Sequence, residues 1–461
     1  MKKFYIVSCL LLLFGVSLLS AFSFDPNTSV SKTIVVCFTK DAIGTQDRSI
    51  DFNIQDGVVV TGLASFDNLA KRYQIVGLER FFDAVKVPQW NDNGIYMQNI
   101  YKARLASDDV MDAALAELIK DPALRYAEFE TVNRQYFVPN DPMVAQQYAL
   151  DVIQAYEAWD YTMGSHDVKL AVTDSGVKWN HPDLRANIWV NPAEAPGMTI
   201  NWDAGTYSGG NGVDAGEGGN KADDLMGWNF YPPVSNNPMQ NWPDNYHGTH
   251  VAGCAAAVGN NMIGVSGSCP IVSIISCKGA PHTSSVNTVY DGYNQMKYAA
   301  EVGAHVINAS WGGQTTTGGL NTANTTINYC TNLGALVVVA AGNSNQLHGA
   351  GYNDAPGDCT NALCVAATGP SDIKASFSDY GEPIDICAPG EGILSTIIQS
   401  NGYTNADGTS MASPIVAGVA ALVKSINPDL TPLQLRQRLM MTADYIYDIN
   451  PNYEGLLGAG R

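Results

Sequence analysis

From about residue 168 onward, short apolar, β-rich runs alternate with longer amphipathic stretches. Two of the longer stretches have helical spacing and end at a glycine, as helices commonly do: Val286–Val302 and Thr322–Asn332. The short runs have the length and the β-branched content of strands: Val168–Thr173, Ile271–Cys277, His305–Ala309, Ala335–Ala340, Ala362–Thr368 and Ile384–Cys387. This alternation predicts an α/β fold with a doubly wound, mostly parallel sheet and helices on both faces.

The N-terminus differs from the rest of the chain. Two lysines open the sequence, an apolar stretch follows, and no further charge comes before Asp25. This pattern is typical of a secretory signal, and the small residue Ser23 favours cleavage near that position. An uncleaved membrane anchor is the alternative. We therefore expect residues 1–23 to be a signal peptide and the protein to be secreted or held at the cell surface.

Residues 24–136 predict a small α+β domain. The β-branched runs Thr33–Phe38 and Gly57–Thr61 indicate strands. The segment Val110–Ile119 places its apolar side chains on one helical face, and Pro122 follows it.

The charge of the chain excludes one class of partner. The formal net charge is −19, and residues 140–461 carry most of it. Binding to nucleic acid needs clustered lysine and arginine to neutralise phosphates. We therefore expect no nucleic-acid partner.

Export would permit disulfides, but the cysteine spacing does not fix a pairing. Seven of the nine cysteines lie beyond residue 140, and an odd number cannot all pair within the chain. Cys359 and Cys364 are close enough in sequence to bridge a short loop. Cys277 and Cys387 lie in apolar runs and fit better as small buried residues.

Reactive side chains stand where such a sheet would present them, because ligands of parallel sheets bind at the carboxyl ends of the strands. Asp174 follows a predicted strand, His247 opens an alanine-rich apolar stretch, and Ser410 lies at the start of another. A serine hydroxyl becomes a nucleophile when an imidazole takes its proton, and a carboxylate orients that imidazole. Asn343 ends a further strand, and its amide can donate to an oxyanion beside the helix N-terminus at Ser410.

Four segments occur in a characteristic order: Asp174-Ser-Gly, His247-Gly-Thr-His-Val-Ala-Gly, Ala341-Gly-Asn343 and Gly408-Thr-Ser-Met-Ala-Ser-Pro. With them, residues 137–461 resemble the subtilisin-like serine proteases (subtilases), most closely in motif detail the thermitase-like branch. The resemblance implies that Asp174 orients His247, which acts as general base and then acid. It also implies that Ser410 attacks the scissile carbonyl, and that the Asn343 side chain and the Ser410 N–H bind the oxyanion. His250 has no such role and is interpreted as a packed helix residue.

The resemblance also implies how substrate binds. Ser310, Trp311 and Gly312 follow a predicted strand that resembles the family strand pairing with an extended protein or peptide substrate. Many relatives have a smaller aliphatic residue at the position of Trp311, so core packing is the alternative there.

We expect the protein to be a monomer.

The N-terminal domain acquires a role from the same resemblance. Residues 24–136 resemble the inhibitory, fold-assisting propeptides of subtilases, so the chain's own propeptide is expected to inhibit it until self-cleavage near Tyr136-Phe137. A slowly folding parallel sheet gives such a segment a physical purpose. A permanently attached domain is the alternative.

Structural calcium is implied in the same way, with no catalytic cofactor. Asp141, Asp183 and Asn261, with the backbone carbonyls of Val258, Ile263 and Val265, match the strong calcium site of thermitase-like members. The alternative is that Asp183 and Asn261 only stabilise turns. The acidic, glycine-rich stretch Asp203–Asp224 is a candidate second ion-binding loop, through Asp223 and Asp224.

The leading hypothesis is therefore a secreted, calcium-stabilised serine endopeptidase made as a zymogen. An inactive scaffold on a protease fold and an esterase acting on small substrates are the alternatives. The end of the chain, Leu457–Arg461, resembles the start of a segment that leads into a final helix in the family. Either that helix is absent or the peptidase domain is truncated at its C-terminus.

Overall fold

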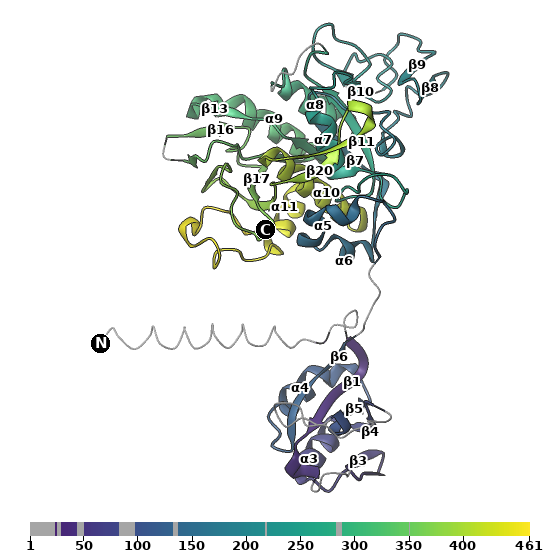
Figure 1. Cartoon of the computed structure of the whole chain (residues 1–461), viewed down its shortest axis with the longest axis vertical. Helices are drawn as coiled ribbons and strands as arrows, with labels where there is room; N and C mark the ends of the chain where they lie inside the picture. The colour runs from purple at the N-terminus through teal and green to yellow at the C-terminus, as the bar shows by residue number, and fades with distance from the viewer. Residues whose placement is uncertain are drawn as a thin grey trace, which may run out of the picture. The chain divides into compact units, whose positions relative to one another are not determined.

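The computed structural model describes residues 24, 29–43, 50–82, 97–131, 137–216, 219–282, 288–349 and 351–461. The chain divides into two compact units, Met1–Gln135 and Tyr136–Arg461 (Figure 1). The predicted signal peptide, residues 1–23, lies outside the described residues.

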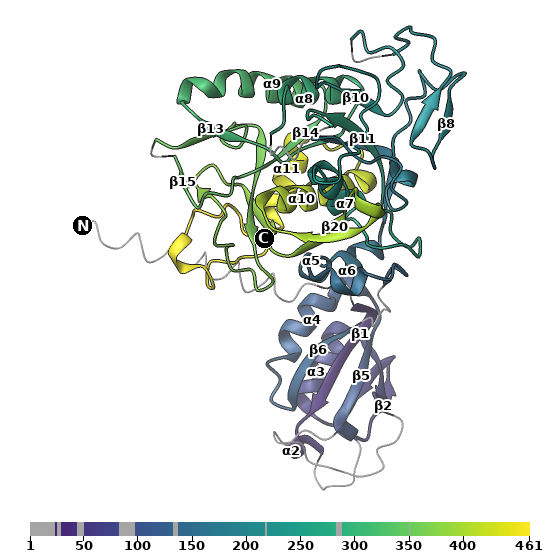
Figure 2. The ribbon, with the colours of Figure 1, turned by 45° about the horizontal axis from the view of Figure 1, so that its top comes forward.

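The N-terminal unit is built on a four-stranded antiparallel sheet with the order β4–β5–β1–β6. Ile34, Val36 and Phe38 alternate along β1 and therefore lie on one face of the sheet. They share a core with residues of both α3 and α4, so the two helices cover the same face (Figure 2). The elements are β1 (Ser29–Phe38), α2 (Lys40–Ile43), β2 (Asn53–Gln55), β3 (Val58–Val60), α3 (Ala64–Tyr73), β4 (Ile75–Arg80), β5 (Ile100–Leu105), α4 (Met111–Leu118) and β6 (Leu124–Thr131). The structure confirms both predicted strands and the predicted helix of this unit.

The C-terminal unit contains a parallel sheet of seven described strands with the order β10–β11–β7–β12–β14–β17–β19. Each strand that the sequence predicts is present. The strands are β7 (Gly164–Asp174), β10 (Gly227–Asn229), β11 (Ile271–Lys278), β12 (Val306–Ala309), β14 (Leu336–Ala340), β17 (Ala362–Thr368) and β19 (Ile386–Pro389).

The strand order places a topological switch beside β7. Within this sheet, β10 and β11 are the next two strands after β7 in the chain, and they lie on one side of β7. The later strands β12, β14, β17 and β19 lie on its other side. A crevice opens at the carboxyl ends of the strands at such a switch, and ligands bind there. Asp174 is the last residue of β7, and Ser310 directly follows β12, so both lie at this crevice.

Helices cover both faces of the sheet (Figure 2). Leu336 and Val338 of β14 belong to one core, and Val337 and Val339 belong to the other, as the alternation of a strand requires. The first core also receives α5 (Tyr148–Val152), α6 (Ala155–Trp159), α7 (His247–Ala256), α10 (Thr409–Ile426) and α11 (Pro432–Met441); the second receives α8 (Gly292–Glu301) and α9 (Leu320–Asn332). The predicted doubly wound α/β fold is confirmed.

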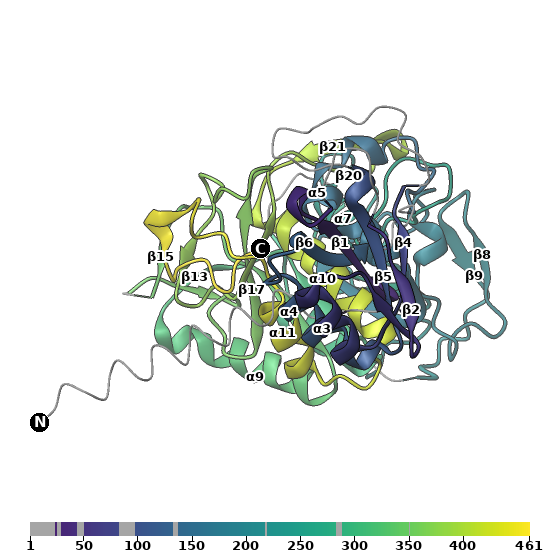
Figure 3. The ribbon, with the colours of Figure 1, turned by 90° about the horizontal axis from the view of Figure 1, so that it is seen from below.

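Short hairpins and pairs surround the sheet. The hairpin of β20 and β21 is anchored to α7, because Ser395 and Thr396 donate side-chain hydrogen bonds to the carbonyls of His250 and Thr249 (Figure 3). The elements involved are β8 (Thr199–Asn201) with β9 (Thr206–Ser208), β13 (Gly313–Thr315) with β16 (Asn353–Ala355), β15 (Leu347–His348) with β18 (Tyr380–Gly381), and β20 (Ile393–Thr396) with β21 (Tyr403–Ala406).

The helix α10 is the one in the described residues with the length and apolar composition to span a membrane. Of the residues of α10, 67% are buried within this unit, and its buried apolar residues belong to the first core. Its apolar character is therefore accounted for by packing against the sheet.

Two expectations need correction. The helix predicted over Val286–Val302 is too long at its start, because α8 begins at Gly292 and Asp291 before it has a positive φ of 55°. The bridge considered between Cys359 and Cys364 is absent, since both are free, buried thiols. Cys364 lies inside β17, which is paired on both sides, so it packs as a small apolar residue.

Candidate active site

The sequence-predicted catalytic and substrate-binding residues line one cleft. The cleft has a volume of about 1040 Å³ and lies at the carboxyl ends of β7, β12 and β14. Its lining includes Asp174, His247, Asn343 and Ser410, together with Ser310, Trp311 and Gly312. The predicted metal ligands are not part of this lining and lie around the loop of residues 258–265.

Asp174 and His247 form a hydrogen-bonded pair. The carboxylate is fully buried at the end of β7, and its two oxygens lie 2.9 and 3.1 Å from Nδ1 of His247. Burial opposes the charged imidazole, but the charge and hydrogen bond of Asp174 outweigh it, so the pKa of His247 is raised. With Nδ1–H directed at the carboxylate, Nε2 carries the lone pair. The His247 side chain remains 40% exposed, and Nε2 can therefore serve as a base in the cleft.

Glycine at position 248 allows this close approach. A Cβ there would lie 2.5 Å from the carbonyl oxygen of Gly176 and 3.0 Å from Oδ1 of Asp174. The N–H of Gly248 also donates to Oγ of Ser175 at 3.0 Å. The start of α7 is thereby fixed against the end of β7. His250, the other histidine of α7, is fully buried and its pKa falls to about 4 through burial, as expected of a packed helix residue.

Ser410 is the second residue of α10. Its Oγ donates to the carbonyl of Ser310 at 3.1 Å, and among the described residues no hydrogen bond joins it to His247. Catalytic hydrogen bonds are often long or misaligned before substrate binds, so this geometry is compatible with a nucleophile. The first turn of a helix has N–H groups without intrahelical acceptors, and these face developing negative charge favourably.

Pro414 determines which group bonds to the backbone carbonyl of Ser410 in α10. Proline has no N–H, so the carbonyl of Ser410 lacks its partner four residues later in the helix. The hydroxyl of Ser310 donates to that carbonyl instead, at 2.9 Å. The sequence analysis did not identify this linkage, although a proline inside an otherwise helical segment is a signal for it.

Asn343 is oriented by Thr409, which the sequence analysis also did not identify. The backbone N–H and the hydroxyl of Thr409 donate to Oδ1 of Asn343 at 2.8 and 2.9 Å. Because the amide oxygen is held in this way, the Nδ2 donors of the exposed side chain remain available to the cleft. Thr409 is therefore a positioning residue for Asn343.

Trp311 both lines the cleft and packs against neighbouring elements, so the substrate-binding and the packing interpretations both apply to it. Its indole N–H donates to the carbonyl of Thr173 at 2.8 Å, and its ring packs edge-on against Tyr293 at 5.6 Å. The ring is thus fixed between β7 and the start of α8 while it lines the cleft. Gly312 beside it is exposed, so its backbone is accessible to an extended chain.

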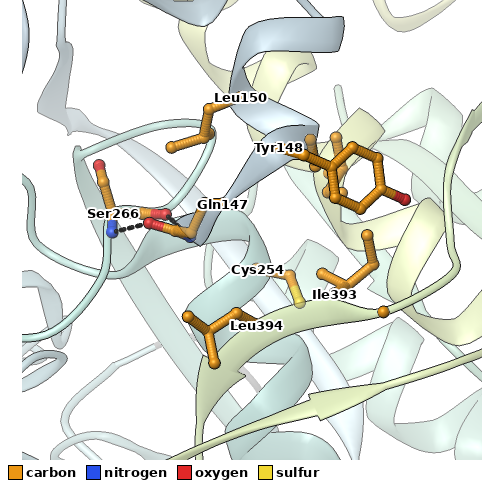
Figure 4. Close-up of a pocket in the computed structure, with 10 residues that line it drawn as sticks. Gln147, Tyr148, Leu150, Cys254, Ser266, Ile393 and Leu394 are labelled. Carbon is orange, nitrogen blue, oxygen red and sulfur yellow. Dashed lines mark hydrogen bonds between the residues drawn. The ribbon is translucent and has the colours of Figure 1, made fainter. Parts of the chain in front are cut away.

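A second, much smaller cavity lies away from these residues (Figure 4). Its volume is about 20 Å³, enough for about one water molecule. Gln147, whose side-chain oxygen accepts the N–H of Ser266 at 2.8 Å, forms part of its wall.

The candidate calcium ligands converge at one loop. Asp183 is fully buried and Asp141 is 3% exposed, and burial raises the pKa of Asp183 to about 7, with Asp141 adding to the rise. Asn261 joins them, because its N–H donates to Asp141 at 3.0 Å and its side-chain amide donates to Asp183 at 2.8 Å. No donor within the described ranges bonds to the remaining candidates, the carbonyls of Val258, Ile263 and Val265.

The acidic stretch is arranged differently. Asp224 is buried and accepts hydrogen bonds from Tyr298 at 2.6 Å and from Asn191 at 2.8 Å. Asp223 accepts backbone N–H groups of its own loop, and the side chain of Asp203 is 97% exposed. In the part of the chain that the structure describes, no three His, Cys, Asp or Glu side chains gather as a metal cluster. Asp223 therefore stabilises its own loop, and Asp224 joins the stretch to Tyr298 and Asn191.

Comparisons with known proteins agree with the geometry. The model of the Subtilase family matches residues 165–460. Thermitase of Thermoactinomyces vulgaris is 38% identical over 67% of this chain and 93% of its own length. Thermophilic serine proteinase of Bacillus sp. (strain AK1) is 35% identical over 73% of this chain and 71% of its own length.

Two further proteins are similar. Extracellular protease of Xanthomonas campestris pv. campestris is 36% identical over 73% of this chain and 59% of its own length. A solved protease structure from Pseudoalteromonas arctica matches with a TM-score of 0.52 and 30% identity, over 70% of this chain and 96% of that one. The cleft and these similarities together show that the chain belongs to the subtilase family of serine proteases.

Proposed function

We propose that this protein is a secreted serine endopeptidase that hydrolyses peptide bonds through Asp174, His247 and Ser410. The observation that carries the proposal is that these residues and Asn343 line a single cleft, with His247 bonded to buried Asp174. An inactive scaffold would not need a buried carboxylate paired with a half-exposed imidazole. The proposed product of the first stage is an ester between Ser410 and the N-terminal part of the substrate.

In the first stage, Nε2 of His247 takes the proton of Ser410 as Oγ bonds to the scissile carbonyl carbon. The electron pair of the C=O bond moves to the oxygen, which accepts hydrogen bonds from Asn343 Nδ2 and the Ser410 N–H. The intermediate collapses as the C–N bond breaks, and the leaving nitrogen takes the proton from His247. Water then repeats the sequence on the ester, which releases the acid and restores Ser410.

The shape of the cleft favours an extended protein or peptide as substrate. Gly312 and Gly313 are exposed along one wall, and their backbone groups can pair with a substrate strand. Backbone pairing gives affinity independent of sequence, which suits an endopeptidase better than an esterase for small molecules.

A fluorophosphonate probe and an unfolded protein together test this function. We expect the probe to modify Ser410, identified by peptide mass, and to stop the cleavage of reduced casein. An unlabelled Ser410 with no cleavage would indicate an inactive scaffold. Labelling without cleavage of casein would indicate an esterase.

The pH dependence follows from His247. The base must be neutral, and Asp174 raises the pKa of His247 above its ordinary value. Activity is therefore expected to fall as pH decreases through this raised pKa, so the acid limb of kcat/KM lies above about 6.5. Measurement of kcat/KM on a peptide substrate between about pH 5 and 9 checks this, and an acid limb below the ordinary histidine range contradicts it.

Processing from a zymogen is part of the proposal. The backbone nitrogen of Phe137 donates to Oδ1 of Asp160 at 3.0 Å. Cleavage before Phe137 would turn this nitrogen into an α-ammonium, and a charge-assisted bond to Asp160 would then stabilise the new terminus. This supports residues 24–136 as a removable, inhibitory propeptide.

Secretion is supported by the similarity to proteins such as the Extracellular protease of Xanthomonas campestris. It also fits the charge-free apolar stretch near the N-terminus.

Calcium at the loop of residues 258–265 is the last part of the proposal. Two neighbouring buried carboxylates, Asp141 and Asp183, would be favoured in their charged forms by a cation, and three carbonyls of the loop have no donor within the described ranges. Calcium prefers six to eight such hard oxygens. The residues present therefore fit the ion. Bound calcium would hold the loop to the segment before α5.

Removal of calcium is expected to lower the melting temperature by several degrees, because an ion that binds only the folded state stabilises it by mass action. Differential scanning calorimetry with EGTA and with restored calcium measures the shift. Asp183→Asn should lose most of this calcium response, whereas Asp224→Asn should retain it. An equal melting temperature with and without EGTA would contradict the assignment.

A further inference from the structure

The cleft contains a carboxylate that the proposed mechanism does not use. Asp354 of β16 lines the cleft and is 4% exposed. Among the described residues, its Oδ1 has no hydrogen bond of normal geometry, although the backbone N–H of Gly313 acts on the carboxyl and lowers its pKa. A buried polar atom without a partner costs free energy unless a ligand or water satisfies it. Asp354 is therefore a candidate for contact with the substrate.

Glycine brings the substrate-pairing segment against this carboxylate. Asp354 lies opposite Gln314 in the antiparallel pair of β16 and β13. A Cβ at Gly312 would lie only 2.5 Å from Oδ1 of Asp354. The carboxylate therefore lies next to the backbone of Gly312, which is expected to pair with the substrate strand.

Negative charge is in excess around Asp354. Nδ1 of His348 lies 2.6 Å from Asp358, and its Nε2 lies 3.4 Å from Asp379. Burial opposes the charge of His348, but its bonds to these two carboxylates raise its pKa to about 9. One imidazolium cannot balance three carboxylates. The ammonium of Lys374 lies near Asp379 and adds a second positive charge, which still leaves three carboxylates against two cations.

The excess of negative charge contributes to a raised pKa of Asp354. Burial raises its pKa to about 7, Asp358 and Asp379 add to the rise, and His348 opposes it. A cation brought next to Asp354 would restore its ionised form.

We propose that the cleft selects peptides with Lys or Arg immediately N-terminal to the scissile bond, and that Asp354 binds the cationic side chain. The inference rests on the proposed function, because it places the scissile carbonyl between Ser410 and Asn343. The side chain of that residue branches from the Cα bonded to the carbonyl carbon, so it would enter the part of the cleft lined by Gly342 and Gly312. An ammonium or guanidinium there would pair with the carboxylate of Asp354, whereas an aliphatic chain would leave the carboxylate unpaired.

The test compares processed wild-type enzyme with Asp354→Asn, which keeps the shape of the side chain and removes its charge. The value of kcat/KM is measured near pH 8 for peptide p-nitroanilides that differ only in the last residue, either Lys or norleucine. Norleucine matches the apolar stem of Lys without its charge. Wild type should prefer Lys by about tenfold or more, and Asp354→Asn should bring the ratio near unity while it still cleaves the norleucine peptide.

The overall charge of −19 could also favour cationic peptides, so two controls separate the effects. Asp429→Asn removes one exposed charge elsewhere and should keep the ratio. A rise in salt from about 0.05 to 0.5 M screens long-range attraction but should preserve most of the preference given by a buried pair.

The outcomes distinguish this inference from the proposed function. A Lys to norleucine ratio at or below unity in wild type overturns the inference and leaves the endopeptidase intact, even if Asp354→Asn does not fold. A ratio that persists in folded Asp354→Asn also overturns it. Failure to cleave either peptide, with no labelling of Ser410, overturns the proposed function instead.

Discussion

Replacement of Ser410 with alanine is expected to abolish both the cleavage of substrates and the separation of the N-terminal unit. Loss of the nucleophile lowers kcat by about 10⁶-fold in subtilisin, a member of the same family, and we expect a similar loss. The fold should persist, because Ser410 Oγ makes one hydrogen bond, to the carbonyl of Ser310, and the residue is partly exposed. The bonds between Thr409 at the start of α10 and Asn343 after β14 do not involve this hydroxyl.

The measurement is the mass and N-terminal sequence of each protein, expressed with residues 24–136 and incubated with calcium. Wild type should begin near Phe137, and Ser410→Ala should stay full length. Ser425→Ala is the matched control, since Ser425 lies in the same helix but not in the cleft lining, and its hydroxyl contacts the carbonyl of Leu422 at 2.7 Å and the hydroxyl of Thr162 at 3.3 Å. It should process as wild type does. Processing of purified Ser410→Ala at the wild-type rate would show that another nucleophile acts.

The sequence predicted the parts of this fold that depend on local pattern. The β-branched runs became strands because both faces of a parallel sheet are buried, as the two cores on either side of β14 show. The positions of Asp174 and Ser410 followed from the same pattern, since a strand end and a helix start can be read from residues nearby in the chain. The sequence shows that position 248 is a glycine, but it does not show that another part of the backbone lies close to Gly248.

What the sequence could not predict depends on contacts between distant residues. The hydroxyl of Ser310 bonds to the carbonyl of Ser410, 100 positions away, only because β12 and α10 meet at the cleft. Asn343 and Thr409 are likewise brought together by the fold. Asp354 stands in the short strand β16, which no motif marks, and the lack of a well-formed hydrogen bond to its Oδ1 is a property of packing.

Replacement of Asn343 with leucine is expected to lower kcat by about 10²–10³-fold with little change in KM, the loss known for removal of such a donor in subtilisin. Leucine is close to asparagine in size but cannot donate to the oxyanion. The donor acts mainly in the transition state, where the carbonyl oxygen becomes negative, so ground-state binding should be nearly unaffected.

Thr409→Val provides a graded comparison, because it removes one of the two bonds that orient Asn343 and keeps the backbone N–H bond. Its loss in kcat should lie between wild type and Asn343→Leu. Melting temperatures close to wild type would show that both effects arise in the cleft rather than from unfolding. If Asn343→Leu retained wild-type kcat, or if its loss lay entirely in KM, the oxyanion would have to be stabilised by other donors, such as N–H groups at the start of α10. Because Asn343 Oδ1 is already held by Thr409, the geometry leaves the Nδ2 group free for that role, and we expect the loss in kcat.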